Sequence, residues 1–416
     1  MTTRILLIST ALCFLSCNDA EKKQDLLLKE GPWRAELQVS DSEVLPFNFE
    51  VLSNGQLEIY NADEVIFVKD VSYENDSVLI QTPVFAGYIK AAVGDSTLNG
   101  NYIKEDLDRV VPFRASYGKS DRFVATSKDA AQNVSGNWEA VFSQDTDDAY
   151  IAKGIFEQDG QKVTGTFRTT TGDYRYLEGV VEGNQMKLST FDGAHAFLFT
   201  AEVEDSLMNG TFYSGNHWQE PFTAKRNDDF ELPKADSLTF LKEGYDKIEF
   251  SFPDSEGNTV SLSDSRFQDK VVLVQIMGTW CPNCLDESTF FSEYYKKQKD
   301  KDLEIVALAF EYAKTEENAF KNIERLKNDV GIEYPILLAQ VGTSSKAKAN
   351  EKLPMLNHVL SYPTTIFIDR AGKVRKIHTG FNGPATGEKF TEFKKEFDAF
   401  VKQLLAETTE ELNEKL

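Results

Sequence analysis

Two cysteines separated by two residues are the part of this sequence best suited to chemistry. Cys281 and Cys284 lie in the stretch M-G-T-W-C-P-N-C-L-D-E, directly after the apolar, β-branched run Val271–Met277, which predicts a buried strand. Gly278 then turns the chain into a helix that starts at the first cysteine. Unpaired amides and the dipole at a helix start stabilise a thiolate. Cys281 is therefore the expected nucleophile, and Cys284 the expected resolving thiol.

The spacing of the pair favours redox chemistry over two other uses. Helical spacing places both sulfurs on one face and within disulfide reach, so they can alternate between dithiol and disulfide without large backbone movement. Zinc would need four ligands, but the mature chain offers no second cysteine pair. A structural disulfide normally closes a long loop, whereas this one would close a single helical turn. The four histidines show no paired metal-ligand spacing; they are His195, His217, His358 and His378.

The residues around the cysteines resemble a known family. Together with Y-P-T-T-I-F-I-D at residues 362–369, the cysteine-containing string is similar to the TlpA/ResA-like thiol-disulfide oxidoreductases, which are membrane-tethered members of the thioredoxin superfamily. The likeness includes Trp280 before the nucleophile and Glu287 three residues after Cys284, and it covers residues 248 to about 405. It implies an α/β thioredoxin-like fold for this part of the chain.

The same resemblance implies a set of substrate-binding residues. Pro363, after Tyr362, takes the place of the cis-proline that the superfamily holds beside its cysteines. Its bend leaves the Tyr362 backbone free to pair with an extended substrate. Gly380 matches a glycine near the substrate groove, where a side chain would block approach. Trp280 and Pro282 complete this set.

A carboxyl group for proton transfer is expected at Glu287. Thioredoxin carries a buried acid six residues before its first cysteine, but here that position is Gln275, which cannot titrate. Glu287 matches the family's acidic residue after the C-x-x-C motif and would exchange a proton with Cys284. The open alternative is that Glu287 simply faces solvent on the first helix.

Composition excludes nucleic acid as a partner. The 416 residues carry a formal net charge of -22, whereas phosphate binding needs clustered Lys and Arg. The length is sufficient for two or three domains. Only four cysteines are present, and none remains for a structural disulfide once the leader and the redox pair are assigned. We expect no metal and no cofactor.

Residues 1–17 have the layout of a secretion signal, with a basic start and an apolar run too short for a stable transmembrane anchor. The tripeptide L-S-C that ends at Cys17 resembles the bacterial lipobox, although Phe14 stands where the pattern prefers Leu. We therefore expect a cell-envelope lipoprotein anchored to the membrane through a lipid on Cys17. Simple secretion is the open alternative. Polar residues 18–30 would form the tether.

The next part of the chain shows an internal duplication. G-P-W-R-A-E-L at Gly31 recurs as G-N-W-E-A-V-F 105 residues later, and further marks recur in the same order. The repeats predict β module 1 at residues 31–118 and β module 2 at residues 134–228. Short alternating segments separated by turn residues predict antiparallel meanders, closed or nearly closed into small barrels. In module 2 the expected strands are 149–158, 162–169, 174–182 and 185–191.

These modules contain no evident group of residues that carries chemistry. Trp33 and Trp138 could line a ligand pocket, but a Trp at the start of a meander more often plugs the barrel end. His195 and His217 are isolated in sequence, and such histidines are mostly structural or exposed.

After a linker at residues 229–245, residues 246–405 form the expected thioredoxin-like domain, followed by an acidic tail at 406–416. The fold class is thus multidomain, with two all-β antiparallel meander or barrel modules and then an α/β domain. Beyond the active strand and its helix, which runs to about residue 298, further elements are predicted from the pattern. They are a hairpin at 250–262, strands at 304–311 and 332–339, a helix at 314–329, a helix or loop at 344–358, hairpin strands at 364–369 and 373–381, and a closing helix at 388–405.

The leading interpretation is a membrane-anchored protein-disulfide reductase. The resemblance implies that its partners are thiol and disulfide proteins of the cell envelope and a membrane thiol donor. One alternative is a thiol peroxidase of the peroxiredoxin type, but its P-x-x-x-T-x-x-C motif is not reproduced around Gly278 and Thr279. Another is a ligand- or protein-binding lipoprotein whose β modules carry the function, with an accessory thioredoxin domain.

Overall fold

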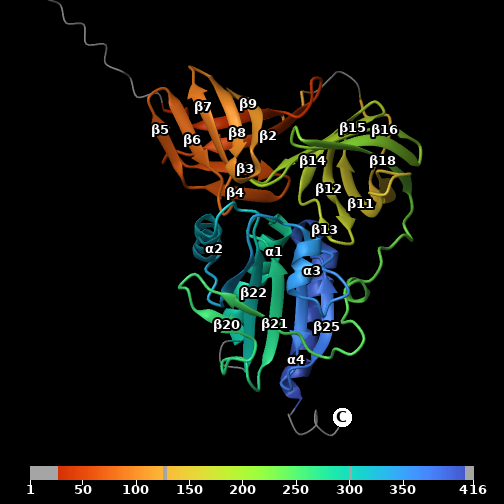
Figure 1. The fold of residues 1–416 in the computed structure, drawn as a ribbon. Helices are drawn as coiled ribbons and strands as arrows, with labels where there is room; N and C mark the ends of the chain where they lie inside the picture. The colour runs from red at the N-terminus through yellow and green to blue at the C-terminus, as the bar shows by residue number, and fades with distance from the viewer. Residues whose placement is uncertain (1–26, 125–128, 299–301, 408–416) are drawn as a thin grey trace, which may run out of the picture.

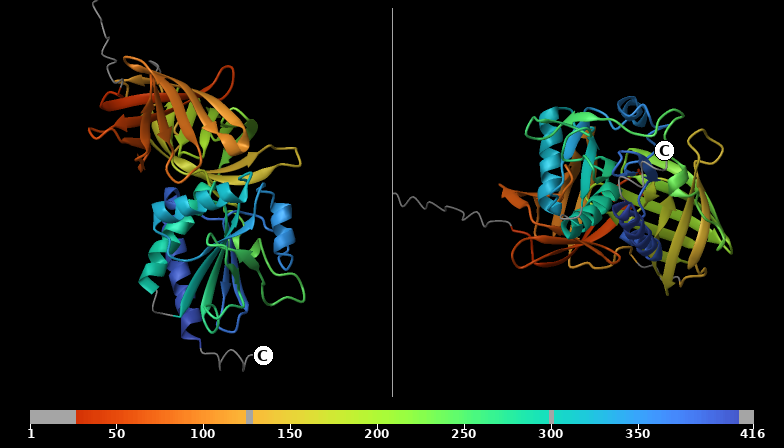
Figure 2. Two further views of the ribbon diagram at one scale, coloured as in Figure 1. Left: turned by 60° about the vertical axis from the view of Figure 1, so that its left-hand side comes forward. Right: turned by 90° about the horizontal axis from the view of Figure 1, so that it is seen from below.

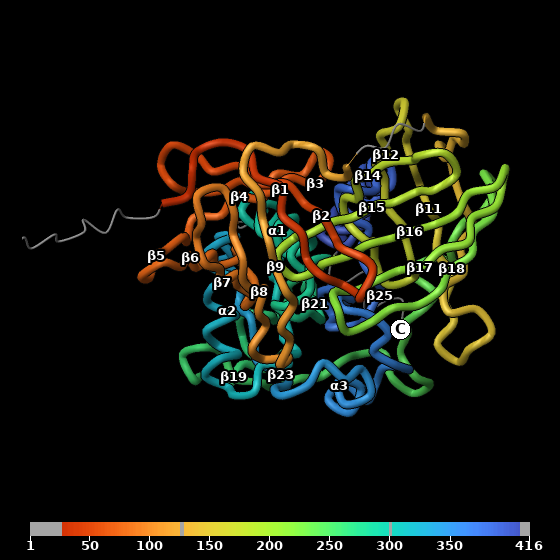
Figure 3. Tube along the Cα trace, turned by 90° about the horizontal axis from the view of Figure 1, so that it is seen from above, coloured from red at the N-terminus to blue at the C-terminus, as the bar shows by residue number. Residues whose placement is uncertain are grey.

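The computed structural model describes residues 27–124, 129–298 and 302–407. Two antiparallel β modules lie side by side above an α/β domain, which is the expected multidomain fold class (Figures 1 and 3). The candidate lipidation residue Cys17, the rest of the leader and most of the acidic tail lie outside the described residues.

Module 1 is a nine-stranded antiparallel sheet in the order β4-β3-β2-β1-β9-β8-β7-β6-β5. Strands adjacent in sequence pair with one another, and β9 returns to pair with β1. The sheet has no ladder between β4 and β5, so backbone pairing does not close this meander. The strands are β1 (Gly31–Gln38), β2 (Val44–Val51), β3 (Leu57–Asn61), β4 (Glu64–Val68), β5 (Val71–Glu74), β6 (Ser77–Gln81), β7 (Tyr88–Val93), β8 (Thr97–Lys104) and β9 (Arg109–Tyr117).

Module 2 repeats this plan and closes it. Its order is β11-β10-β18-β17-β16-β15-β14-β12-β13, and a ladder between β11 and β12 joins the two sides. The strands are β10 (Gly136–Phe142), β11 (Tyr150–Asp159), β12 (Lys162–Thr169), β13 (Gly172–Asp173), β14 (Leu177–Glu182), β15 (Gln185–Phe191), β16 (Ala196–Glu204), β17 (Leu207–Ser214) and β18 (Trp218–Arg226).

The two modules place their first tryptophan in the same way. Trp33 donates its indole N–H to the carbonyl of Lys29, and Trp138 donates to the carbonyl of Val134, both at 2.9 Å. Both indoles are buried, as expected of side chains that plug a barrel end. Leu28 is also buried, so the last residues of the expected tether belong to the packed module.

The modules share an apolar contact. Phe191 at the end of β15 reaches into module 1, where its ring stacks on Phe47 at 4.4 Å between centroids and meets Tyr102 edge-on at 5.1 Å. Arg122, in the connection between the modules, is buried and donates to the hydroxyl of Ser189 in β15. The modules therefore pack against each other through side chains from both cores.

The α/β domain is built on a five-stranded sheet in the order β23-β22-β21-β24-β25. Its centre is β21 (Val271–Met277), which has the predicted bounds and is buried throughout, because both faces of the sheet are covered. Strands β22 and β23 run parallel to it, while β24 is antiparallel. The other strands are β19 (Ser251–Pro253) and β20 (Thr259–Ser261), which form a hairpin, and β22 (Leu303–Phe310), β23 (Ile336–Gln340), β24 (Thr364–Ile368) and β25 (Val374–Thr379).

Four helices cover this sheet. Helix α1 packs against α4 through Phe290 and Phe397, whose rings are 5.0 Å apart, and against the end of α2 through Ser292. Helix α3 lies on the opposite side of the sheet from the other three (Figure 2). No helix in the described ranges is long and apolar enough to span a membrane. The helices are α1 (Pro282–Gln298), α2 (Glu316–Val330), α3 (Lys346–Lys352) and α4 (Glu388–Ala406).

The expected linker is held against the α/β domain. Asp236 pairs with His378 of β25 at 2.7 Å, and the hydroxyl of Thr379 donates to that of Thr239 at 2.9 Å. This segment therefore lies along the edge strand rather than acting as a free connection.

Candidate active site

The two cysteines lie where the central strand meets the first helix. The amide of Leu285 donates to the carbonyl of Cys281 at 3.0 Å, so the first turn of the helix starts at this cysteine, as predicted. The backbone N–H of Cys284 donates to the Cys281 sulfur at 3.2 Å. A donor aimed at the sulfur stabilises negative charge there. The carbonyl of Tyr362 lies 3.4 Å from the same sulfur.

The two sulfurs have different surroundings. Cys281 keeps 7% of its surface exposed, whereas Cys284 is fully buried. Burial raises the pKa of Cys284 well above its ordinary value. The hydrogen bond with Cys281 and electrostatic repulsion by that cysteine act in the same direction. The raised pKa keeps Cys284 in the thiol form near neutral pH. This arrangement supports Cys281 as the attacking sulfur.

The residues expected to bind substrate gather around Cys281. The peptide bond between Tyr362 and Pro363 is cis, as predicted, and Gly380 donates its N–H to the Pro363 carbonyl at 2.9 Å. The Trp280 ring meets the Tyr362 ring nearly edge-on at 5.5 Å, and its indole N–H donates to the carbonyl of Phe310 at 3.0 Å. The cysteine turn, the cis-proline loop and the loop at Gly380 thus form one surface.

Glu287 is buried behind the cysteines, so the solvent-facing alternative is wrong. The hydroxyl of Thr365 and the amide of Gln275 donate to its two carboxyl oxygens at 2.8 and 2.9 Å. Burial raises the pKa of Glu287 to about 7, although these two hydrogen bonds act in the lowering direction. Its charge contributes to the raised pKa of Cys284. Gln275 therefore helps to hold the Glu287 carboxyl in place.

A second buried acid, Glu311, was missed at the sequence level. It follows β22, and both the N–H and the hydroxyl of Thr279 donate to its carboxylate at 2.7 Å. Burial raises the pKa of Glu311 to about 7. The signal in the sequence is slight, because a single Glu that ends an apolar run normally reaches solvent. Only the folded structure shows that Glu311 lies beside Thr279, the residue before Trp280.

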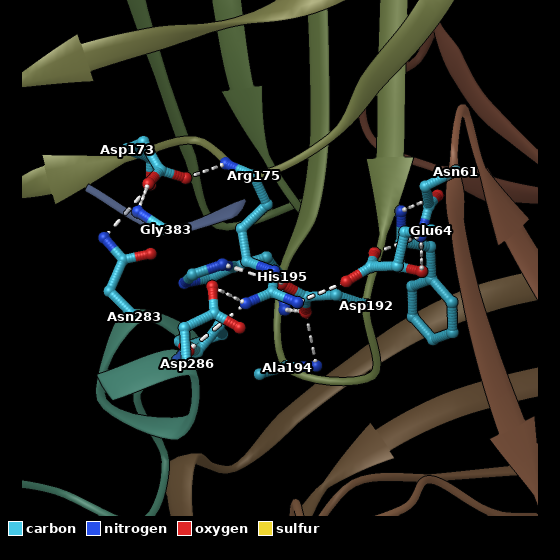
Figure 4. Close-up of polar contacts among 12 residues, drawn as sticks. Asn61, Glu64, Asp173, Arg175, Asp192, Ala194, His195, Asn283, Asp286 and Gly383 are labelled. Atoms are coloured by element: carbon cyan, nitrogen blue, oxygen red, sulfur yellow. Dashed lines mark hydrogen bonds and ion pairs between the residues drawn. The ribbon is translucent and has the colours of Figure 1, made fainter. Parts of the chain in front are cut away.

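A turn of module 2 lies on the cysteine motif. We call residues 169–173, which run from the end of β12 through β13, the covering turn. Ser361 donates its hydroxyl to the carbonyl of Thr171 at 2.8 Å. Asn283, between the cysteines, donates its side-chain amide to the carbonyl of Asp173 at 3.1 Å, and the N–H of Gly383 donates to the Asp173 carboxylate at 2.6 Å (Figure 4). The first turn of α1 and two loops of the α/β domain therefore bind this turn.

Two glycines show how closely the backbone of the covering turn approaches the α/β domain. Gly172 in the covering turn has φ +148°, and a methyl group there would lie 1.9 Å from the amide nitrogen of Asn283. A methyl group on Gly380 would lie 2.8 Å from the carbonyl carbon of Thr171. The close approach predicted at Gly380 is thus present, but the chain's own turn makes it. The covering turn occupies the surface where the sequence predicts an extended substrate.

Arg175 anchors this arrangement. Its buried guanidinium forms ion pairs with Asp286 of α1, with Glu64 of β4 and, at 3.6 Å, with Asp192, and it also donates to the carbonyl of Pro282 at 3.3 Å (Figure 4). Burial lowers the pKa of Arg175, but the three carboxylates together raise it well above its ordinary value. One cation therefore joins both β modules to the active-site helix.

The histidines form no metal centre in the described part of the chain, which holds no group of three or more His, Cys, Asp or Glu arranged for one. His195, expected to be isolated, is bonded to Asp192 at 3.1 Å. His358 lies 3.0 Å from the carbonyl of Leu238. These histidines thus have structural partners.

Known proteins resemble the C-terminal part of this chain. Residues 243–394 match the family model described as Redoxin. Thioredoxin-like protein YneN of Bacillus subtilis (strain 168) is 29% identical over 140 residues, which are 34% of this chain and 73% of that protein. Thiol-disulfide oxidoreductase ResA of Bacillus thuringiensis subsp. konkukian (strain 97-27) is 30% identical over 152 residues, 36% of this chain and 76% of that protein. A crystal structure of a thiol:disulfide interchange protein of the thioredoxin family from Chlorobium tepidum TLS is 20% identical, covers 40% of this chain and 99% of that chain, and gives a TM-score of 0.30.

Proposed function

Through its C-terminal domain the chain belongs to the ResA-like thiol-disulfide oxidoreductases of the thioredoxin superfamily, and from this premise we propose that it is a membrane-anchored reductase of disulfides in exported proteins. As a member of this family it is an enzyme that exchanges thiols and disulfides with protein substrates. In the proposal, Cys281 and Cys284 carry the exchange, Glu287 moves a proton, and Cys17 carries the lipid. The substrate-binding residues are Trp280, Pro282, Tyr362, Pro363 and Gly380.

The reaction needs two thiol exchanges. The Cys281 thiolate attacks one sulfur of the substrate disulfide, which forms a mixed disulfide and releases the first substrate thiolate. Cys284 then loses its proton to the Glu287 carboxylate and attacks the Cys281 sulfur. The second substrate thiol leaves, and the enzyme holds a Cys281–Cys284 disulfide. Two electrons from a membrane thiol donor restore the dithiol.

The surroundings of Cys284 are the observation that supports the reducing direction. A strong oxidant of this superfamily owes its high potential to a stabilised reduced form, in which a thiolate is favoured. Here Cys284 is fully buried and its pKa is raised by burial, by Cys281 and by the charge of Glu287. Cys284 therefore adds no thiolate that would stabilise the reduced form, as a low reduction potential requires.

Cysteine usage and the leader support a place in the cell envelope. The first 17 residues read as a lipoprotein signal, and all other cysteines are accounted for by the redox pair. Exported compartments are kept oxidising, so a dithiol that must stay reduced there needs a dedicated electron donor at the membrane.

Equilibration of the full mature chain with a glutathione buffer tests the direction. We expect a potential near that of thioredoxin, around -270 mV, whereas a value near -120 mV would identify an oxidant. A chain isolated from growing cells wholly as the disulfide would also contradict the proposal. A Cys284→Ala variant should retain its substrates as mixed disulfides and so identify them.

A further inference from the structure

A cavity lies where the two β modules and the α/β domain meet. Its volume is about 280 Å³, close to the lower end of small-molecule sites, at roughly 300 Å³. Lys104 and Arg109 of module 1, His195 and His217 of module 2, and Trp280 of the α/β domain line it. Trp280 directly precedes the nucleophilic cysteine, so an occupant of this cavity would lie next to the redox centre.

The lining is basic in a chain that is strongly acidic. None of the fifteen described residues around the cavity is Asp or Glu, although the chain holds 67 acidic residues against 45 Lys and Arg. Phe197, Tyr102 and Tyr312 supply aromatic walls. The cavity therefore combines positive charge with apolar surface, which is the composition that suits an organic anion.

Neither Lys104 nor Arg109 forms an ion pair with a carboxylate among the described residues. The Arg109 guanidinium has no hydrogen-bond or ion-pair partner among the described residues. Lys104 donates to the carbonyl of Ala194 at 3.0 Å, which uses one of its three donors. Burial first, and then repulsion by Arg109, lowers the pKa of Lys104 to about 8, although attraction by Asp192 acts in the raising direction. Leaving such groups unpaired costs free energy, and a bound anion would remove that cost.

The nearby carboxylates are largely engaged elsewhere. Asp192, next to the cavity, is held by His195 and Arg175. Asp108 pairs with Lys314 at 2.7 Å. Asp106 is close enough to Tyr312 to contribute to its raised pKa, but it does not line the cavity. Burial, Arg109 and Lys104 lower the pKa of His217 to about 4, so this ring is neutral at pH 7.

We propose that this cavity is a binding site for a small organic carboxylate, with the carboxylate on Arg109 and Lys104 and a short apolar or aromatic body against Trp280. The volume suits a single-ring molecule rather than a segment of polypeptide. Residues from all three parts of the chain form the site, so its ligand would also hold the β modules on the redox domain.

Calorimetric titration of the reduced, full mature chain with phenylacetate tests this site, and phenylacetamide provides a neutral molecule of the same shape. We expect saturable binding of phenylacetate, at least tenfold weaker binding of phenylacetamide, and at least a tenfold loss in an Arg109→Gln variant. An Arg114→Gln variant is the matched control, because Arg114 lies on the same strand with an exposed side chain paired to Glu36. Thermal unfolding of both variants checks that they fold.

Tryptophan fluorescence gives a second readout. Addition of phenylacetate should change the emission of the wild-type chain, and a Trp280→Phe variant should lose that change. Equal affinity for the acid and the amide, or unchanged phenylacetate binding in Arg109→Gln, would overturn the site. So would the absence of saturation by phenylacetate, benzoate and hydrocinnamate up to about 10 mM. None of these measurements depends on turnover, so failure of the binding site can be distinguished from failure of the proposed reductase function.

Discussion

The side-chain amide of Asn283, one of the two residues between the redox cysteines, donates a hydrogen bond to the backbone carbonyl of Asp173 in the second β module at 3.1 Å. The C-x-x-C motif is thus itself a docking surface for another part of the chain. Since Gly383 and Ser361 also bind the covering turn, an extended substrate can reach this surface only by replacing the turn.

Substitution of Gly172 by Ala should open the site. The added methyl group would lie 1.9 Å from the Asn283 amide nitrogen, so the covering turn must lift away or that side chain must move. If the Asn283 side chain moves instead, the turn still loses its hydrogen bond from that amide. We therefore expect iodoacetamide to alkylate Cys281 several-fold faster than in the wild-type chain, with the rate followed by mass spectrometry. Gly160→Ala is the matched control, because Gly160 also has positive φ but has open space around it. Identical rates in all three chains would show that the turn does not limit access.

The two cysteines should behave differently on substitution. Cys281→Ser should abolish disulfide exchange, while Cys284→Ser should accumulate mixed disulfides that it cannot resolve. The reason is that Cys281 is partly exposed and receives an N–H donor, whereas Cys284 is buried with a raised pKa. Alkylation of the reduced protein at acidic pH measures this difference directly. Preferential labelling of Cys284 would reverse the assignment.

Replacement of Glu287 by Gln should remove a pH-dependent step near neutrality. With its pKa at about 7, Glu287 becomes a base as the pH rises through 7, so the rate of mixed-disulfide resolution should rise there in the wild-type chain. Stopped-flow measurements of this rate should show no such inflection in Glu287→Gln. Glu293→Gln on the exposed face of the same helix is the control. An inflection that persists in Glu287→Gln would remove Glu287 from proton transfer.

The same carboxyl also predicts a change in stability. Its folded-state pKa lies above the unfolded value of about 4.3, so the unfolded state loses its proton first as the pH rises. The stability contribution is therefore full below roughly pH 4.3 and is lost by about pH 7, at a cost of roughly 3 kcal/mol. Urea unfolding of the wild-type and Glu287→Gln chains at pH 5 and 8 measures this. The wild type should weaken relative to the variant at the higher pH.

Arg175→Met should detach the β modules from the redox domain. The substitution leaves the buried carboxylates of Asp286, Glu64 and Asp192 without their shared cation. Loss of one partner of a buried ion pair costs about 3–5 kcal/mol, and we expect this loss in the first urea unfolding transition. Lys162→Met, which breaks an exposed pair with Glu178, should cost less than about 1 kcal/mol. Similar losses in both variants would contradict the anchoring role of Arg175.

The local sequence pattern was sufficient to predict much of the fold. The strands predicted at 162–169, 185–191 and Val271–Met277 have the observed bounds, because alternation or a continuous apolar run fixes them. The strand expected at 174–182 begins only at Leu177. Arg175 has φ +59°, and its side chain turns towards carboxylates from distant parts of the chain, which alternation along one segment cannot reveal.

The candidate site likewise contains residues that could be predicted from the sequence and residues that could not. The cysteines, the cis-proline and Gly380 could be predicted from a family motif, because all of them lie within a single domain. The covering turn and Arg175 could not be predicted, since their role depends on how the modules dock. Glu311 shows a further limit, because only its contact with Thr279 distinguishes it from a solvated strand end.

The place where the chain enters module 1 bears on where the proposed lipid anchor is attached relative to the redox centre. Leu28 donates its N–H to the hydroxyl of Tyr73 in β5, and β5 lies at the side of module 1 that is farthest from module 2 (Figures 1 and 3). With the anchor proposed at Cys17, module 1 would be the part of the described chain that follows the lipid attachment most closely in sequence. The cysteines would then be carried by the domain that follows both modules, so the lipid and the redox centre would be attached to different parts of the molecule.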